Sequence, residues 1–82
     1  MKINPNLAVS ESGFLFNPGT GESFTVNPTG AEIIRLLREG LSLEQVIDAF
    51  TEQFQVDRHT FEKDLHDFSG ILKTYNLLEK DE

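Results

Sequence analysis

Residues 27–37 mark a change in the character of the sequence and limit what the chain can fold into. The stretch opens with Asn27-Pro28-Thr29-Gly30-Ala31-Glu32 and continues as Ile33-Ile34-Arg35-Leu36-Leu37, the pattern of a capped amphipathic helix. Residues 1–26 read as short strands and turns, whereas two more helical patterns follow. A chain of 82 residues buries only roughly 60 % of its unfolded surface, so we expect a single domain over residues 1–82.

Three short strands are predicted, at about residues 7–9, 14–16 and 22–26. Turn signals separate them, at Ser10-Glu11-Ser12-Gly13 and at Asn17-Pro18-Gly19-Thr20-Gly21. Phe14 and Phe16 share one face of the second strand at period two. Tight turns predict an antiparallel meander, which leaves the third strand at an edge of the sheet.

Three helices are predicted, at about residues 29–39, 43–55 and 58–75. Thr29-Gly30-Ala31-Glu32 and Ser42-Leu43-Glu44-Gln45 both have the form of a capping box. Asn27 before a proline is a competing start for the first helix, and Asp57 is the expected cap of the third. The order β-β-β-α-α-α predicts an α+β, winged-helix-like fold, in which a three-stranded antiparallel sheet precedes a three-helix bundle.

The third helix is the longest and carries an unbroken apolar stripe, formed by Phe61, Leu65, Phe68, Leu72 and Tyr75 and widened by Ile71. Gly70 within this helix costs roughly 1 kcal/mol relative to Ala, so we expect another group to approach its backbone closely. With seven Phe, one Tyr and no Trp, Phe is expected to dominate the bulky packing.

The charge balance argues against a nucleic-acid partner. The formal net charge is −7, and most of it falls in the helical half that would have to enter a groove. The chain has no Cys, no secretory h-region at its start and no apolar run near the ~18 residues of a membrane span. We therefore expect a cytoplasmic monomer that binds neither nucleic acid nor membrane.

Catalytic and metal-binding patterns are weak. His59 and His66 are two helical turns apart, too far along the axis to chelate one ion. Asp64 and Asp67 could lie near each other, although such a pair is typical of a hydrated surface. The chain contains no nucleophile elbow, phosphate loop or Cys nucleophile. We expect no enzyme activity, no metal and no cofactor.

An edge strand beside a long apolar helix favours peptide binding, because exposed N–H and C=O groups can pair with an added strand. The same stripe of the third helix could instead be ordinary core. A winged-helix DNA regulator is an alternative, with contacts from Arg58, His59, Lys63, His66 and Lys73, but Glu62, Asp64 and Asp67 are interleaved with them. A second alternative is a scaffold that docks on a larger enzyme through the acidic face of the second and third helices.

The sequence resembles the PqqD family over nearly its whole length. The resemblance is carried by Asn27-Pro28-Thr29-Gly30-Ala31-Glu32-Ile33, by Gly40-Leu41-Ser42-Leu43-Glu44-Gln45-Val46 and by Leu72-Lys73-Thr74-Tyr75-Asn76-Leu77-Leu78-Glu79. It implies a peptide chaperone with a precursor-peptide recognition fold. The leader segment of a ribosomally made precursor would add beside the third strand, pack on the third helix and be presented to a modifying enzyme, often a radical S-adenosylmethionine enzyme.

Carried over to this chain, the resemblance implicates two sets of residues in peptide binding. The strand set is Ser23, Phe24, Thr25 and Val26, and the helix set is Leu65, Phe68, Ser69 and Leu72. No catalytic residue is implied.

Overall fold

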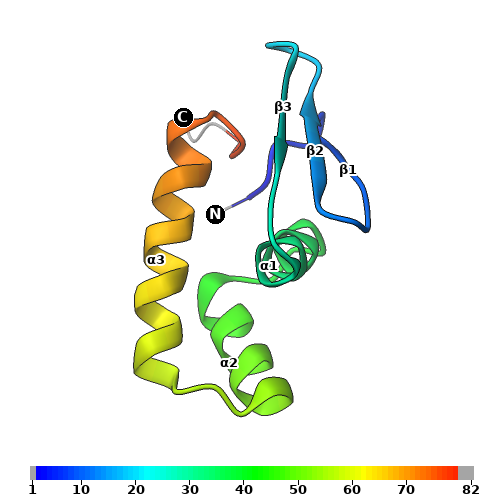
Figure 1. The fold of residues 1–82 in the computed structure, drawn as a ribbon. Coiled ribbons are helices and arrows are strands. Elements are labelled where there is room, and N and C mark those ends of the chain that lie inside the picture. The colour runs from blue at the N-terminus through cyan, green and yellow to red at the C-terminus, as the bar shows by residue number, and fades with distance from the viewer. Residues whose placement is uncertain (1, 80–82) are drawn as a thin grey trace.

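The computed structural model describes residues 2–79 and has three strands followed by three helices. The strands are β1 (Ala8–Val9), β2 (Phe14–Asn17) and β3 (Glu22–Thr25), and the helices are α1 (Pro28–Arg38), α2 (Leu43–Phe54) and α3 (Arg58–Thr74). Both strand pairs are antiparallel, and the sheet order is β1-β2-β3. Figure 1 shows α1 crossing below the sheet, with α3 rising alongside β3. The predicted α+β class is confirmed.

The sheet register depends on a glycine turn between β1 and β2. Gly13 has a φ of +90°, and a Cβ at this position would lie 2.5 Å from the carbonyl oxygen of Val26. This close approach lets the Val26 N–H donate to the Gly13 carbonyl at 2.9 Å. In the same register Leu15 pairs with Phe24, and Phe14 pairs with Thr25.

The helix starts show which cap the chain uses. The Asn27 side-chain oxygen accepts from the Gly30 N–H at 2.8 Å, and Pro28 occupies the first turn of α1. Glu32 binds Arg35 instead of reaching back to Thr29, so the competing start at Asn27 is the one that forms. The Ser42–Gln45 capping box of α2 is complete, and Asp57 accepts from the Thr60 N–H at the start of α3.

The core is mainly aliphatic, contrary to the expectation that Phe would dominate it. Its buried hydrophobic residues are Ile3, Leu7, Leu15, Ile33, Ile34, Leu37, Val46, Ile47, Phe50, Phe61, Leu65, Leu72 and Leu77. Phe50 and Phe61 stack with ring centroids 4.6 Å apart. Of the other five Phe side chains, Phe24 and Phe68 are half-buried against the core, and Phe14, Phe16 and Phe54 are exposed.

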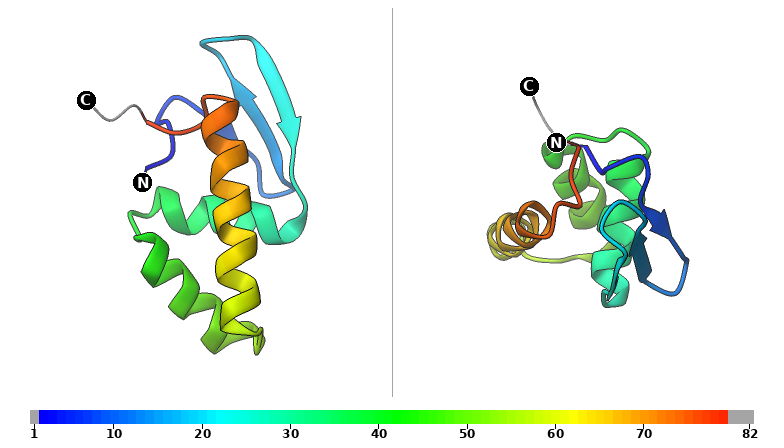
Figure 2. Two further views of the ribbon diagram at one scale, coloured as in Figure 1. Left: turned by 90° about the vertical axis from the view of Figure 1, so that its left-hand side faces the viewer. Right: turned by 90° about the horizontal axis from the view of Figure 1, so that it is seen from above.

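The two ends of the described chain are joined at the back of the molecule. Ile3 and Leu78 form an antiparallel bridge, the Asn4 N–H donates to the Leu77 carbonyl, and the Glu79 N–H donates to the Lys2 carbonyl. Figure 2 shows this joined pair of segments on the side away from the β2–β3 hairpin. The segment after α3 therefore pairs with the start of the chain and not with β3.

Candidate functional site

The free edge of β3 carries unpaired backbone groups. Hydrogen-bonded and non-hydrogen-bonded pairs alternate along an antiparallel ladder. Because Val26 bonds directly to Gly13, Phe24 also turns its N–H and C=O toward β2. The N–H and C=O of Ser23 and Thr25 must then point away from the sheet. Within residues 2–79, no backbone hydrogen bond to these groups is found beyond the ladder with β2.

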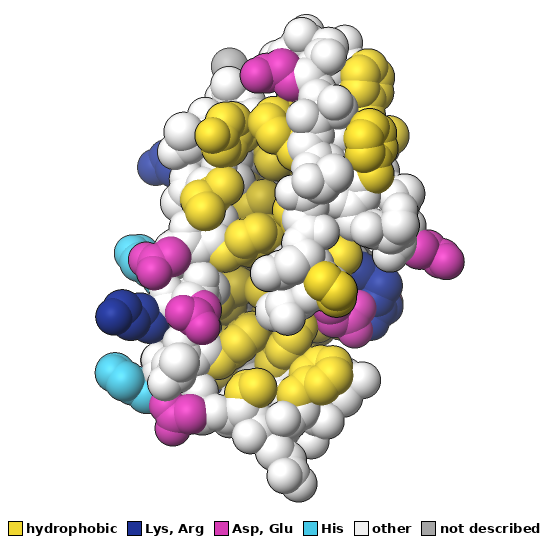
Figure 3. All heavy atoms as spheres, in the orientation of Figure 1, with side chains coloured by type: hydrophobic (Ala, Val, Ile, Leu, Met, Phe, Trp, Pro, Cys, Tyr) yellow, Lys and Arg dark blue, Asp and Glu magenta, His cyan; other side chains and the backbone are white. Residues whose placement is uncertain are grey.

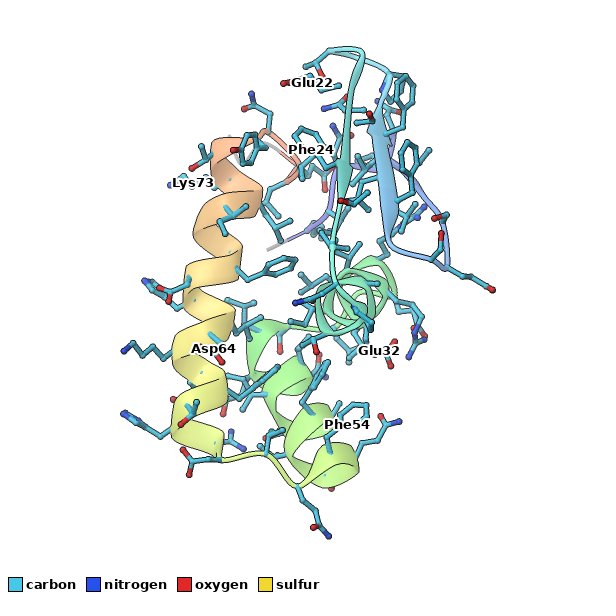
Figure 4. The ribbon with its side chains drawn as sticks, viewed as in Figure 1. Glu22, Phe24, Glu32, Phe54, Asp64 and Lys73 are labelled. Atoms are coloured by element: carbon cyan, nitrogen blue, oxygen red, sulfur yellow. The ribbon has the colours of Figure 1, made fainter. Side chains whose placement is uncertain are left out.

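The side chains of β3 divide between two faces. Phe24 points toward α3, where its ring centroid lies 5.1 Å from that of Tyr75 (Figure 4). Ser23 and Thr25 are exposed on the opposite face of the sheet, opposite Phe16 and Phe14 in the neighbouring strand. A strand added at this edge would therefore alternate its side chains between α3 and solvent.

The predicted helix residues are not all at the surface. Leu65 and Leu72 belong to the core, and Ser69 is buried with its hydroxyl donating to the His66 carbonyl. Only Phe68 of the four is half-exposed. Leu65, Ser69 and Leu72 therefore expose little surface in this structure, and their contact with a peptide stays a prediction.

Two residues outside the predicted set complete the exposed side of α3. Ile71 is 52 % exposed and Tyr75 is 46 % exposed. Together with Phe68 they are spaced so that they lie along one side of the helix. Sequence periodicity included both in the apolar stripe but could not show that Tyr75 lies against Phe24 of β3.

Figure 3 shows the resulting groove as a continuous band of hydrophobic side chains between α3 and the β3–α1 stretch. Gly30 lies at the base of the groove, close to both of its sides. A Cβ at this position would lie 3.2 Å from both the Phe68 ring and the Val26 Cβ. The absence of a side chain at Gly30 thus lets the start of α1 approach both walls of the groove closely.

Below the groove, at the same face of the molecule, lies a hollow of about 620 Å³. It is bounded by the start of α1, the end of α2 and the start of α3, and its lining residues are Pro28, Thr29, Glu32, Phe50, Phe54, Val56, Asp57, Thr60, Phe61 and Asp64. In Figure 4, Glu32, Phe54 and Asp64 come from these three helices around the hollow. We refer to this feature as the lower hollow.

Two carboxylates of the lower hollow are held in their charged form. The hydrogen bond from Arg35 lowers the pKa of Glu32, and the backbone hydrogen bond from Thr60 lowers the pKa of Asp57. Both groups are therefore negatively charged at neutral pH. For Asp64, no hydrogen bond or ion pair is found among the described residues.

Among residues 2–79, no group of three or more His, Cys, Asp and Glu side chains is arranged to hold a metal ion. His59 and His66 are exposed. No helix in the described part of the chain is long and apolar enough to cross a membrane.

Comparison with known protein families decides the classification. Residues 13–78 match the family described as coenzyme PQQ synthesis protein D (PqqD). The chain belongs to the PqqD family. The resemblance noted in the sequence is thereby confirmed, and the exposed β3 edge beside α3 is a feature of a PqqD-family domain.

Two solved structures share the PqqD-family fold of this chain. One is described as TbiB1 in complex with the TbiA(beta) leader peptide; it is 34 % identical, with a TM-score of 0.89, and the match covers 100 % of this chain and 99 % of that one. The other is described as lasso peptide synthetase B1 complexed with the leader peptide; it is 25 % identical, with a TM-score of 0.79, covering 98 % and 96 % of the two chains. A comparison with curated proteins gave no match.

Proposed function

We propose that this protein is a non-catalytic adaptor that binds the leader segment of a ribosomally made precursor peptide and presents it to a modifying enzyme. The observation that carries the proposal is the open edge of β3 beside the exposed apolar side of α3. Both similar structures are complexes with leader peptides, which supports the same class of ligand for this member of the family.

Binding would proceed by strand addition. The outward N–H and C=O groups of Ser23 and Thr25 would pair with the peptide backbone and supply affinity that does not depend on sequence. Every second peptide side chain would enter the groove and contact Phe24, Phe68 or Ile71, which supplies selectivity. A short leader held in this way would reach micromolar affinity, about −8 kcal/mol.

Backbone-amide NMR tests the location of the site. Titration with a leader peptide that binds the protein should shift the Ser23 and Thr25 amides more than those of the β1 edge. Shifts confined to the outer side of α3, or no shifts at all, would contradict the proposal.

Proline substitution tests the mechanism. Ser23→Pro and Thr25→Pro each remove an outward donor while leaving the ladder to β2 in place, and proline is tolerated on the solvent side of an edge strand. We expect each to weaken peptide binding strongly, whereas the matched controls Ser23→Ala and Thr25→Ala keep the donor and retain affinity. Unchanged affinity in both proline variants, with the fold intact by circular dichroism, would show that the edge is not the site.

Duplex DNA provides the test of the alternative regulator function. Specific or non-specific DNA binding depends steeply on salt because phosphate contacts release counterions. We expect no binding at low or moderate salt, since acidic side chains are interleaved with the basic ones along α3.

A further inference from the structure

The lower hollow lies on the path of any strand that adds to β3. After Thr25 the protein chain turns into α1 at Pro28, but an added peptide is not bound to follow that turn. Continuing straight, it passes over the start of α1 toward the hollow. Figure 3 shows the hydrophobic band running without interruption from β3 to this end of the molecule.

The walls of the lower hollow are apolar, and their aromatic rings pack on one another. Phe54 is 49 % exposed, yet its ring lies 5.1 Å from that of Phe50, which in turn stacks on Phe61. Val56 is also exposed and follows in the link to α3. A volume of about 620 Å³ admits a large side chain, and burial of such a side chain is favourable by about 1.5–3 kcal/mol.

The rim of the lower hollow is acidic. Glu32, Asp57 and Asp64 all line it, and none of the described residues that line it is Lys, Arg or His. The nearby Arg35 pairs with Glu32 and Glu39 on the outer side of α1. A negative rim over low-dielectric apolar walls attracts cations and repels carboxylates.

We propose that the lower hollow is a second subsite for the bound peptide, which takes an apolar side chain that has Lys or Arg beside it. This inference rests on the proposed function, because the peptide reaches the hollow only after pairing with β3. The occupant is the part of the peptide that extends beyond Val26. The apolar side chain contacts Phe54 and Val56, and the neighbouring cation lies close to Asp64 at the rim.

Selection from displayed random peptides tests the subsite. An extended chain rises about 3.3 Å per residue, so peptides of about eleven residues match the 37 Å length of the molecule. Selection on the protein should enrich Lys or Arg next to Phe, Tyr or Leu at one end of a strand-forming segment. Selection on the Asp64→Lys variant should lose this enrichment or replace the cation with Asp or Glu.

Individual selected peptides, labelled with a fluorophore, allow a charge-swap measurement. Asp64→Lys should weaken binding by about tenfold, as expected when an ion pair becomes a like-charge contact. Replacing the peptide's cation with Glu should recover most of that loss in the variant. Asp67→Lys makes the same charge change on α3 outside the lower hollow and should alter affinity by less than about twofold. Phe54→Ser should reduce the preference for the apolar residue.

The outcomes separate the subsite from the proposed function. One outcome is that the selected peptides bind the protein but not Thr25→Pro, show no cation preference, and change affinity equally in Asp64→Lys and Asp67→Lys. In that case the subsite is overturned and strand addition stands. If no peptide is enriched, or if binding is indifferent to Thr25→Pro, the proposed function fails and the subsite fails with it. An unchanged peptide affinity in Asp64→Lys likewise overturns the subsite.

Discussion

The two apolar sides of α3 have different neighbours. Phe61, Leu65 and Leu72 are buried in the core, whereas Ile71 and Tyr75 are exposed, and the Tyr75 ring lies beside Phe24 of β3. The composition of the two sides is similar, yet only one is used to stabilise the fold. In so small a domain, apolar surface left in water beside an open strand edge is better explained by a ligand than by stability.

The largest effect should come from the buried side. Leu72→Ala removes a side chain that is 1 % exposed, and such substitutions cost about 2–5 kcal/mol of unfolding free energy. Urea denaturation measures the loss, with the solvent-exposed Thr74→Ala as a control. A change below about 1 kcal/mol would mean that the core extends less far along α3 than the burial indicates.

Gly30→Ala tests a residue of α1 that packs against Phe68, which lies between the buried and exposed sides of α3. Its new Cβ would lie 3.2 Å from the Phe68 ring and from the Val26 Cβ, so both neighbours must shift. We expect a loss of about 1–3 kcal/mol from overpacking, together with weaker peptide binding because Phe68 is displaced into the groove. A more stable protein with unchanged affinity would show that Phe68 moves without cost.

A substitution on the exposed side of α3 should change peptide affinity and leave the unfolding free energy nearly unchanged. Ile71→Ala is expected to change the unfolding free energy by less than about 0.5 kcal/mol. The same substitution should weaken binding of the precursor peptide about tenfold, or about 1.4 kcal/mol. Isothermal titration with the variant and with Lys73→Ala, which lies on another side of α3, makes the comparison. Equal losses in both variants would remove the distinction between the two sides.

The smallest effect concerns a third side of the helix. Among the described residues, nothing lies within 4 Å of a Cβ built at Gly70, so the group expected to approach its backbone closely is not found there. Gly70→Ala should therefore stabilise the protein by about 0.5–1 kcal/mol, because helix formation costs less backbone entropy. Thermal denaturation gives the sign, and reduced peptide binding would indicate that the ligand reaches this side.

The sequence predicted the order of the elements well because local signals set it. Turn residues, capping residues and the spacing of apolar side chains act over a few positions, and Ser42 and Asp57 cap the helices as expected. Asn27 prevailed over Thr29 because the following proline favours the first turn and Glu32 pairs with Arg35.

The site was predicted less completely because it depends on tertiary placement. Periodicity cannot show which amides of a strand point outward; the bond between Val26 and Gly13 decides that for Ser23 and Thr25. Ile71 and Leu72 are adjacent apolar residues, and only the rotation of α3 against the sheet separates the exposed one from the buried one. The lower hollow forms where the start of α1 meets the end of α2 and the start of α3, and no local pattern indicated that meeting.

The bridge between Ile3 and Leu78 has a consequence for protein engineering. Because the segments around Ile3 and Leu78 lie side by side, the domain is suited to insertion into a surface loop of an unrelated host protein. Compact units with neighbouring ends tolerate such insertion well. A host protein with this insertion would carry a domain whose exposed β3 edge faces away from the insertion point.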